Sequence, residues 1–163
     1  MNLSASREPR CELHCSMQLL RNVSFFEELT PDFLRVLAYL CLRRVYAAGD
    51  TIVKEGEPAE AAVVIVRGDG VIERGKAVIE RIEKGRCVGG LSLLGRYRWL
   101  YTLKAVSEVE CLVLPRSSFL PQLQAQPEAL SAIARGLIST VIDREQQQLQ
   151  GPNPGKPAGI GMV

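Results

Sequence analysis

The sequence has few of the residues on which enzyme and metal sites most often depend. Its 163 residues include one His and one Trp, and aromatic residues make up 6% of the chain. A single His cannot build a His-based metal site, and it leaves little basis for catalysis by a Ser/His or Cys/His pair. We find no set of nucleophile, base and orienting group in the sequence. We therefore expect a protein that is not an enzyme and holds no metal.

An excess of one charge and a long apolar run are also missing. Twenty Lys and Arg residues oppose eighteen Asp and Glu residues, so the formal net charge is +2. This balance argues against a nucleic-acid partner, which normally meets a clear basic excess or a basic face. No apolar run approaches the ~18–20 residues that cross a bilayer, and the polar first ten residues lack the apolar core of a secretory signal. We expect a cytoplasmic protein without membrane insertion.

The five cysteines are odd in number and scattered along the chain. They are Cys11, Cys15, Cys41, Cys87 and Cys111. The last three have apolar neighbours, which indicates buried free thiols in a reducing compartment rather than a disulfide framework. Cys11, His14 and Cys15 bring three potential metal ligands together, but a metal site normally needs a fourth. Redox or metal sensing through Cys11 and Cys15 is one hypothesis for the function, beside the two that are given below.

Helical patterns lie on both sides of the central part of the chain. Residues 1–18 form a polar lead-in, and apolar residues at helical spacing begin at Leu19. Thr30 can cap a helix. The Pro and Asp that follow it favour a first helical turn. Another apolar stripe runs along residues 127–150, which predicts a long helix. The tail at 151–163 is rich in Pro and Gly, and we expect it to be disordered.

Between the helical segments, short runs of β-branched residues alternate with glycine turns. Strands at intervals of roughly 8–12 residues are typical of an antiparallel sandwich or a jelly-roll barrel. The expected strands are Thr51–Lys54, Ala62–Arg67, Val71–Arg74, Ala77–Ile82, Leu100–Ser107 and Val109–Leu114. The sequence therefore predicts one mostly-β domain with flanking helices.

This order of elements, together with four sequence stretches, resembles the cyclic nucleotide-binding domain family over about residues 19–149. The stretches are Val45–Glu57, Val63–Ile72, Val88–Leu94 and Thr102–Phe119. The resemblance implies a jelly-roll-type antiparallel β-barrel within one domain, residues 19–150. Its parts would be helices at 19–42, a barrel at 43–115 and C-terminal helices at 116–150.

Members of this family bind the cyclic phosphate through a cassette with the pattern F-G-E-x-A-L-L, a short loop and P-R-x-A-x-V. The resemblance implies helix amides and an Arg for the phosphate, and a Glu for the ribose hydroxyl. Here Gly90 stands at the Glu position, and the register through Thr102 places Trp99 at the Arg position and Tyr101 at the small-residue position. Each lost charged contact costs on the order of 1.5–3 kcal/mol, so two losses weaken binding roughly 10²–10⁴-fold. We expect a degenerate cassette and no cofactor.

The alternative is a sensor that binds cAMP, cGMP or another phosphorylated small molecule through a non-standard cassette. A shift of the loop by one residue would bring Arg98 to the phosphate, and Trp99 or Tyr101 could stack on a base. The candidate ligand-binding residues are Gly89, Gly90, Leu91, Ser92, Arg98, Trp99, Tyr101 and Thr102.

The apolar stripe of the last helix covers more than one face, which favours a shared interface as well as core packing. The resemblance implies a lid or a dimer interface in this region. The candidate interface residues are Leu130, Ile133, Leu137, Val141 and Ile142. The chain ends in a Pro/Gly tail where bacterial transcription factors of this family continue into a helix-turn-helix domain. We therefore expect a stand-alone regulatory domain whose partner is another protein or a second copy, without nucleic acid.

Overall fold

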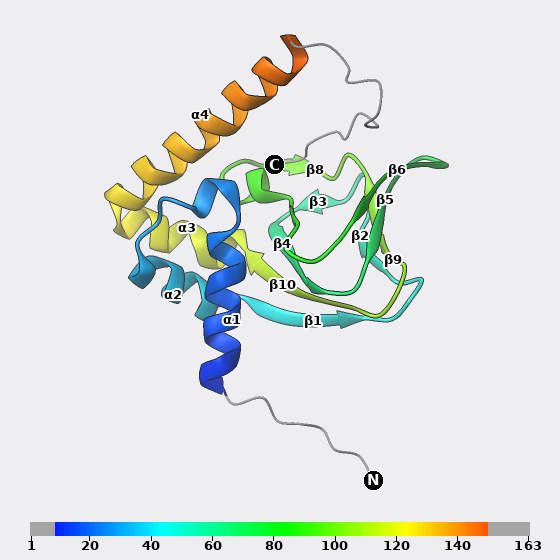
Figure 1. Cartoon of the computed structure of the whole chain (residues 1–163), viewed down its shortest axis with the longest axis horizontal. Coiled ribbons are helices and arrows are strands. Elements are labelled where there is room, and N and C mark those ends of the chain that lie inside the picture. Colours follow the sequence, from blue (N-terminus) through cyan, green and yellow to red (C-terminus); the bar gives the residue numbers. More distant parts are fainter. Residues whose placement is uncertain (1–8, 150–163) are drawn as a thin grey trace.

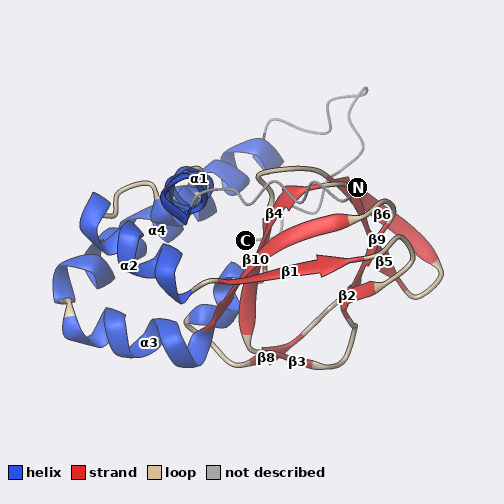
Figure 2. Cartoon of the chain, turned by 90° about the horizontal axis from the view of Figure 1, so that it is seen from below, coloured by secondary structure: helices blue, strands red, loops and turns tan. Residues whose placement is uncertain are grey.

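The computed structural model describes residues 9–149, which form two antiparallel sheets and a group of helices gathered on one side of the strands (Figures 1 and 2). The helices are α1 (Pro9–Arg21), the 3₁₀ turn η1 (Ser24–Phe26), α2 (Pro31–Leu40), the 3₁₀ turn η2 (Gly90–Leu93), α3 (Arg116–Ala125) and α4 (Pro127–Leu149). The strands are β1 (Leu42–Tyr46), β2 (Thr51–Val53), β3 (Pro58–Ala59), β4 (Ala61–Arg67), β5 (Gly70–Arg74), β6 (Ala77–Ile82), β7 (Cys87–Val88), β8 (Tyr97–Arg98), β9 (Thr102–Ala105) and β10 (Val109–Pro115).

The two main sheets each have four strands, and their order departs from the order along the chain. One sheet runs β1-β10-β4-β7 and the other runs β2-β9-β5-β6, while β3 and β8 form a short separate pair. Every pairing within them is antiparallel. Strands that are distant in sequence but adjacent in a sheet are the mark of a jelly-roll connection. The predicted fold class, mostly β and antiparallel with flanking helices, is confirmed.

Strand β4 separates two hydrophobic cores because its successive side chains point to opposite faces. Val64 faces the helices and belongs to a core with Phe26 and Phe119, whose ring centroids lie 6.1 Å apart. Val63 and Ile65 point the other way, into the space between the two sheets. The helical core thus holds α1 to α4 against the first sheet, and the second core fills the barrel.

The start of α2 follows from its sequence. The side chain of Thr30 accepts a hydrogen bond from the backbone N–H of Phe33 at 3.3 Å, and Pro31 occupies the first helical position. A proline there loses no helical hydrogen bond, because the first N–H groups of a helix have no partner within it. The predicted helix start at Thr30 is confirmed.

The N-terminal region differs from the expectation of a polar lead-in over residues 1–18. Helix α1 already begins at Pro9, and Leu13, Met17 and Leu20 lie on its packed side. Ser16 is buried, and its hydroxyl is satisfied because it donates to the backbone oxygen of Glu12 at 2.9 Å. Polar residues with such local partners hide the amphipathic character of the helix in the sequence. The tail at 151–163 lies outside the described residues.

Four strands were not expected from the sequence. Three of them, β3, β7 and β8, have two residues each, which is too short to show alternation. The fourth, β1, contains Arg43 and Arg44 and has no regular burial pattern. Arg43 forms an ion pair with Glu110 on the neighbouring strand β10. Within 9–149, no helix has the length and hydrophobicity needed to span a membrane.

We predict that Gly68→Ala destabilises the fold more than Gly56→Ala. Both glycines have φ +84°, so an alanine at either position has the same backbone strain. A Cβ atom at position 68 would also collide with the carbonyl oxygen of Glu108, whereas position 56 is open. We expect the free energy of unfolding to fall by about 2 kcal/mol more for Gly68→Ala, measured by urea denaturation. Equal losses would contradict this assignment.

Candidate functional site

The stretch predicted to bind phosphate forms η2, a tight turn between β7 and β8. Gly89 precedes it with φ +74°, in the left-handed region that favours glycine. The N–H of Ser92 donates to the oxygen of Gly89 at 2.9 Å, and the N–H of Gly95 donates to the oxygen of Leu91 at 2.9 Å. The turn is therefore closed by its own backbone.

The position that the resemblance assigns to the family's glutamate is closed by an aromatic ring. A Cβ atom at Gly90 would collide with the ring of Phe25, which extends from η1 and is buried. Any side chain at position 90 would require Phe25 to move. Sequence analysis missed Phe25, because nothing in the local pattern around residue 25 indicates which distant residue its ring contacts.

Two more aromatic rings fill the barrel beside the turn. Trp99 and Tyr101 are both buried, with ring centroids 5.7 Å apart and planes at 67°. The Trp99 ring lies so close to Gly89 that a Cβ atom there would overlap it. Burial, followed by the influence of nearby charged and ionisable groups, raises the pKa of the Tyr101 hydroxyl above its ordinary value of 10.0. The aromatic pair is thus a neutral, packed part of the barrel core.

Arg98 and Thr102 serve the neighbouring loop. Arg98 is exposed, and its Nη1 donates to the backbone oxygen of Gly56 at 2.8 Å. The side chain of Thr102 accepts a hydrogen bond from the N–H of Glu55 at 3.1 Å. Neither side chain makes a hydrogen bond to the turn at Gly89–Ser92 within the described residues. Of the candidate residues, the structure brings together the turn glycines, Trp99 and Tyr101.

The remaining two candidates, Leu91 and Ser92, lie on opposite sides of the turn. Leu91 is exposed, whereas Ser92 is completely buried. The Oγ atom of Ser92 has no hydrogen-bond partner among residues 9–149. The candidate residues therefore do not form a single open surface.

Arg116 holds the turn from its C-terminal side. Its Nη1 donates to the backbone oxygens of Ser92 at 3.1 Å, Gly95 at 3.0 Å and Ala59 at 3.3 Å. Its positive charge is suited to the carbonyl end of a helical turn. Sequence analysis had assigned the stretch that contains Arg116 only to the fold. Arg116 directly follows β10, and this place in the chain is the sequence signal that could have drawn attention to it.

Helix α4 is docked on η1 through a close backbone approach. A Cβ atom at Gly136 would lie 2.8 Å from the Cα of Phe25. Nε of Arg135 also forms an ion pair with Oε2 of Glu28 at 2.7 Å. Ile133 is buried and Leu137 is half-buried in the helical core. This corrects the expectation that both belong to an interface, because their face of α4 is covered by the domain itself.

The opposite side of α4 carries exposed aliphatic residues. Leu130, Val141 and Ile142 from the predicted set are 51%, 55% and 46% exposed. Ile138, which the predicted set omitted, is 59% exposed and lies on the same side. In Figure 1 the C-terminal half of α4 extends away from the rest of the described chain. We call these four residues the outer face of α4.

Cys41, which directly follows α2, and the barrel residues Cys87 and Cys111 are poorly ionised. Burial raises the pKa of Cys41 and of Cys87 to about 12, and that of Cys111 to about 11. Such thiols are inert at neutral pH, because the thiolate is the reactive form. Across residues 9–149, no three His, Cys, Asp or Glu side chains lie close enough together to hold a metal ion. The side chain of Cys11 is not among those described.

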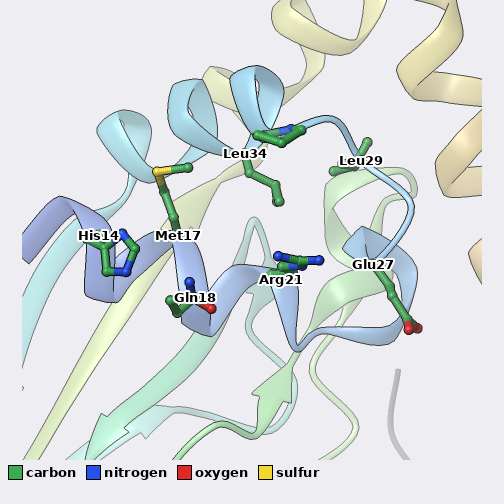
Figure 3. A pocket seen from close by; sticks show the side chains of 8 residues that line it. His14, Met17, Gln18, Arg21, Glu27, Leu29 and Leu34 are labelled. Carbon is green, nitrogen blue, oxygen red and sulfur yellow. The ribbon is translucent and has the colours of Figure 1, made fainter.

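A small pocket lies between α1 and the segment that leads into α2 (Figure 3). Its volume is about 160 Å³. The lining residues are His14, Met17, Gln18, Arg21, Glu27, Leu29, Pro31 and Leu34. None of the candidate ligand-binding residues lines it.

Comparison with known proteins identifies the family. A model of the cyclic nucleotide-binding domain matches residues 43–126, which is more than half of the chain. The chain therefore belongs to the cyclic nucleotide-binding domain family, and the resemblance found in the sequence is confirmed.

Solved structures and curated relatives agree with this assignment. The N-terminal domain of a transcriptional regulator from Streptomyces coelicolor A3(2) shares the fold with a TM-score of 0.73, at 23% identity over 78% of this chain and 95% of that one. A cyclic nucleotide-binding-like protein from Brucella abortus has a TM-score of 0.62 at 30% identity, over 67% of this chain and 97% of its own. A cAMP-dependent protein kinase regulatory subunit from Colletotrichum orbiculare is 29% identical over 102 residues, which are 61% of this chain.

The chain spans about a third or less of the curated relatives that it matches. The matched part covers 34%, 10% and 26% of the length of three of them. The shared unit is thus a domain that occurs in longer proteins with different further parts.

We predict that Arg116→Gln destabilises the turn at η2. The substitution removes the charge and the three hydrogen bonds of Nη1 to backbone oxygens. Losing a hydrogen bond that involves a charged group costs about 1.5–3 kcal/mol, and we expect a loss of this size in the free energy of unfolding. Trp99 fluorescence during urea denaturation measures it. Arg96→Gln is the control, because Arg96 is exposed, and an equal loss in both variants would contradict the role of Arg116.

Proposed function

We propose that this domain is a non-catalytic regulatory unit that does not hold a cyclic nucleotide in its cassette and acts through helix α4. The observation that carries the proposal is the occupation of the cassette by the protein's own rings. Phe25 closes the position at Gly90, and Trp99 covers Gly89. Both charged anchors of the family pattern are absent from these positions, as Gly90 and Trp99 replace them.

The energetic balance supports a cassette without cyclic nucleotide. A ligand would lose two charged contacts, which lowers affinity roughly 10²–10⁴-fold. It would also have to displace the buried ring of Trp99, whose burial contributes about 2–3 kcal/mol to folding. These terms add, because the missing contacts and the displaced ring are separate costs of the same bound state.

A domain of this kind needs another surface through which to act, and the outer face of α4 is the surface we propose. Its members repeat at intervals of three, four and eight residues, so they form one stripe along the helix. A second copy of this chain would present the same stripe, and the paired helices would cover both. We therefore propose self-association through α4, resting on Ile138, Val141 and Ile142.

The first test is a titration of cAMP and cGMP into the purified protein. We expect no saturable change in the fluorescence of Trp99 and no rise in melting temperature at millimolar ligand. A ligand present at 100 times its Kd would stabilise the protein by about 2.7 kcal/mol, which both readouts would detect. Such a response would overturn the proposal and favour a sensor with a non-standard cassette.

The second test addresses the outer face of α4. Val141→Asp places a charge in the middle of the apolar stripe and should convert a self-associating protein to a monomer in sedimentation equilibrium. Ser139→Asp introduces the same charge at an exposed position beside the stripe and should leave the association unchanged. A wild-type protein that is monomeric at all accessible concentrations would contradict self-association.

A further inference from the structure

The pocket between α1 and the segment that leads into α2 has an apolar side and a polar side (Figure 3). The residues of the apolar side are Met17, Leu29, Pro31 and Leu34. Leu29 and Leu34 are buried members of the helical core, and Met17 packs against that core. Close packing fixes side chains of this kind in place, so the apolar side is formed before any ligand arrives.

The polar side of the pocket comes from one face of α1. His14, Gln18 and Arg21 line it. They are spaced by four and by three residues, so they follow one another along the same side of the helix. All three side chains can donate hydrogen bonds. Among residues 9–149, no side-chain hydrogen bond or ion pair occupies any of them.

The guanidinium of Arg21 gives the pocket a positive charge. In Figure 3 it lies between Gln18 and Glu27, and the side chain of Leu34 points toward it. Glu27 also lines the pocket, but its carboxylate points away from the other side chains in this view. No ion pair between these two charges is formed within the described chain. The guanidinium is therefore available to an anion that enters the pocket.

The dimensions of the pocket limit what it can hold. Its volume is about 160 Å³. A protein cavity of about 150 Å³ accepts benzene, which has six non-hydrogen atoms. A ligand of roughly six to eight non-hydrogen atoms therefore fits, whereas a nucleotide or a folded peptide segment is too large.

We propose that this pocket binds a short aliphatic monocarboxylate of about four to six carbon atoms. The carboxylate accepts hydrogen bonds from the guanidinium of Arg21, which can serve both oxygens at once, and from the amide of Gln18. The alkyl chain lies against Leu29 and Leu34, where it leaves water. This site goes beyond the proposed function, because none of its residues belongs to the cassette or to the outer face of α4.

The test is a titration of sodium pentanoate at constant pH and ionic strength, followed by the NMR shifts of the backbone amides. We expect saturable shifts in the millimolar range, concentrated in α1 and in residues 27–34. Two further probes separate the contributions of charge and chain. Acetate keeps the carboxylate without the chain, and n-pentanol keeps the chain without the charge, so each should bind about tenfold more weakly.

Variants place the site on Arg21. Arg21→Gln removes the positive charge and keeps a hydrogen-bond donor, so the affinity for pentanoate should fall about tenfold. The matched control is Arg35→Gln, since Arg35 is exposed on α2 and does not line the pocket. Gln18→Glu is a second variant at an exposed position of α1. It places a negative charge beside the ligand and should weaken binding as well.

Three results would overturn the proposal. They are no saturable shift up to about 50 mM pentanoate, an affinity for acetate or n-pentanol equal to that for pentanoate, and unchanged affinity in Arg21→Gln. None of them bears on cyclic nucleotides or on self-association, which are measured separately and depend on other residues. The two proposals can therefore fail independently.

Discussion

The contact of Phe25 with two glycines is the constraint on which the arrangement of the site depends. Its ring occupies the space in front of Gly90, and its backbone lies where a Cβ atom of Gly136 would be 2.8 Å from its Cα. Two glycines, one in the cassette and one in α4, therefore make room for one residue of η1. Close packing at Phe25 joins these three elements, because interiors at native density leave no slack for an added atom.

Two aromatic rings of this chain stabilise the core of the barrel. Trp99 and Tyr101 bury large apolar surfaces between the sheets, and each contributes about 2–3 kcal/mol by leaving water. A state with an open barrel must give up this contribution. A ligand can shift the equilibrium toward that state only by as much as it prefers the open form over the closed one. In the proposed function, the missing charged anchors leave a cyclic phosphate with little such preference.

The sequence was sufficient for the parts of the fold that depend on local patterns. Ala62–Arg67 could be predicted because β-branched residues run up to a glycine turn, and the start of α2 because Thr30 and Pro31 act within one turn. The site could be predicted only in part. The replacement of the cassette anchors is visible at Gly90, but the ring that closes this position lies 65 residues earlier at Phe25. Such a contact depends on tertiary packing, which no local pattern reports.

Successive residues of a helix are rotated by about 100° around its axis. Helix α4 therefore presents two faces, and their roles differ. One face is fixed against η1 at Gly136, directly behind the ring that closes the cassette. The other face carries the exposed aliphatic stripe. A partner on the stripe that shifts α4 would move Phe25 with it, and a group that displaces Phe25 from the cassette would in turn disturb the docking of α4. If a group were bound at each of the two places, the two binding events would be linked in both directions, with equal coupling free energy.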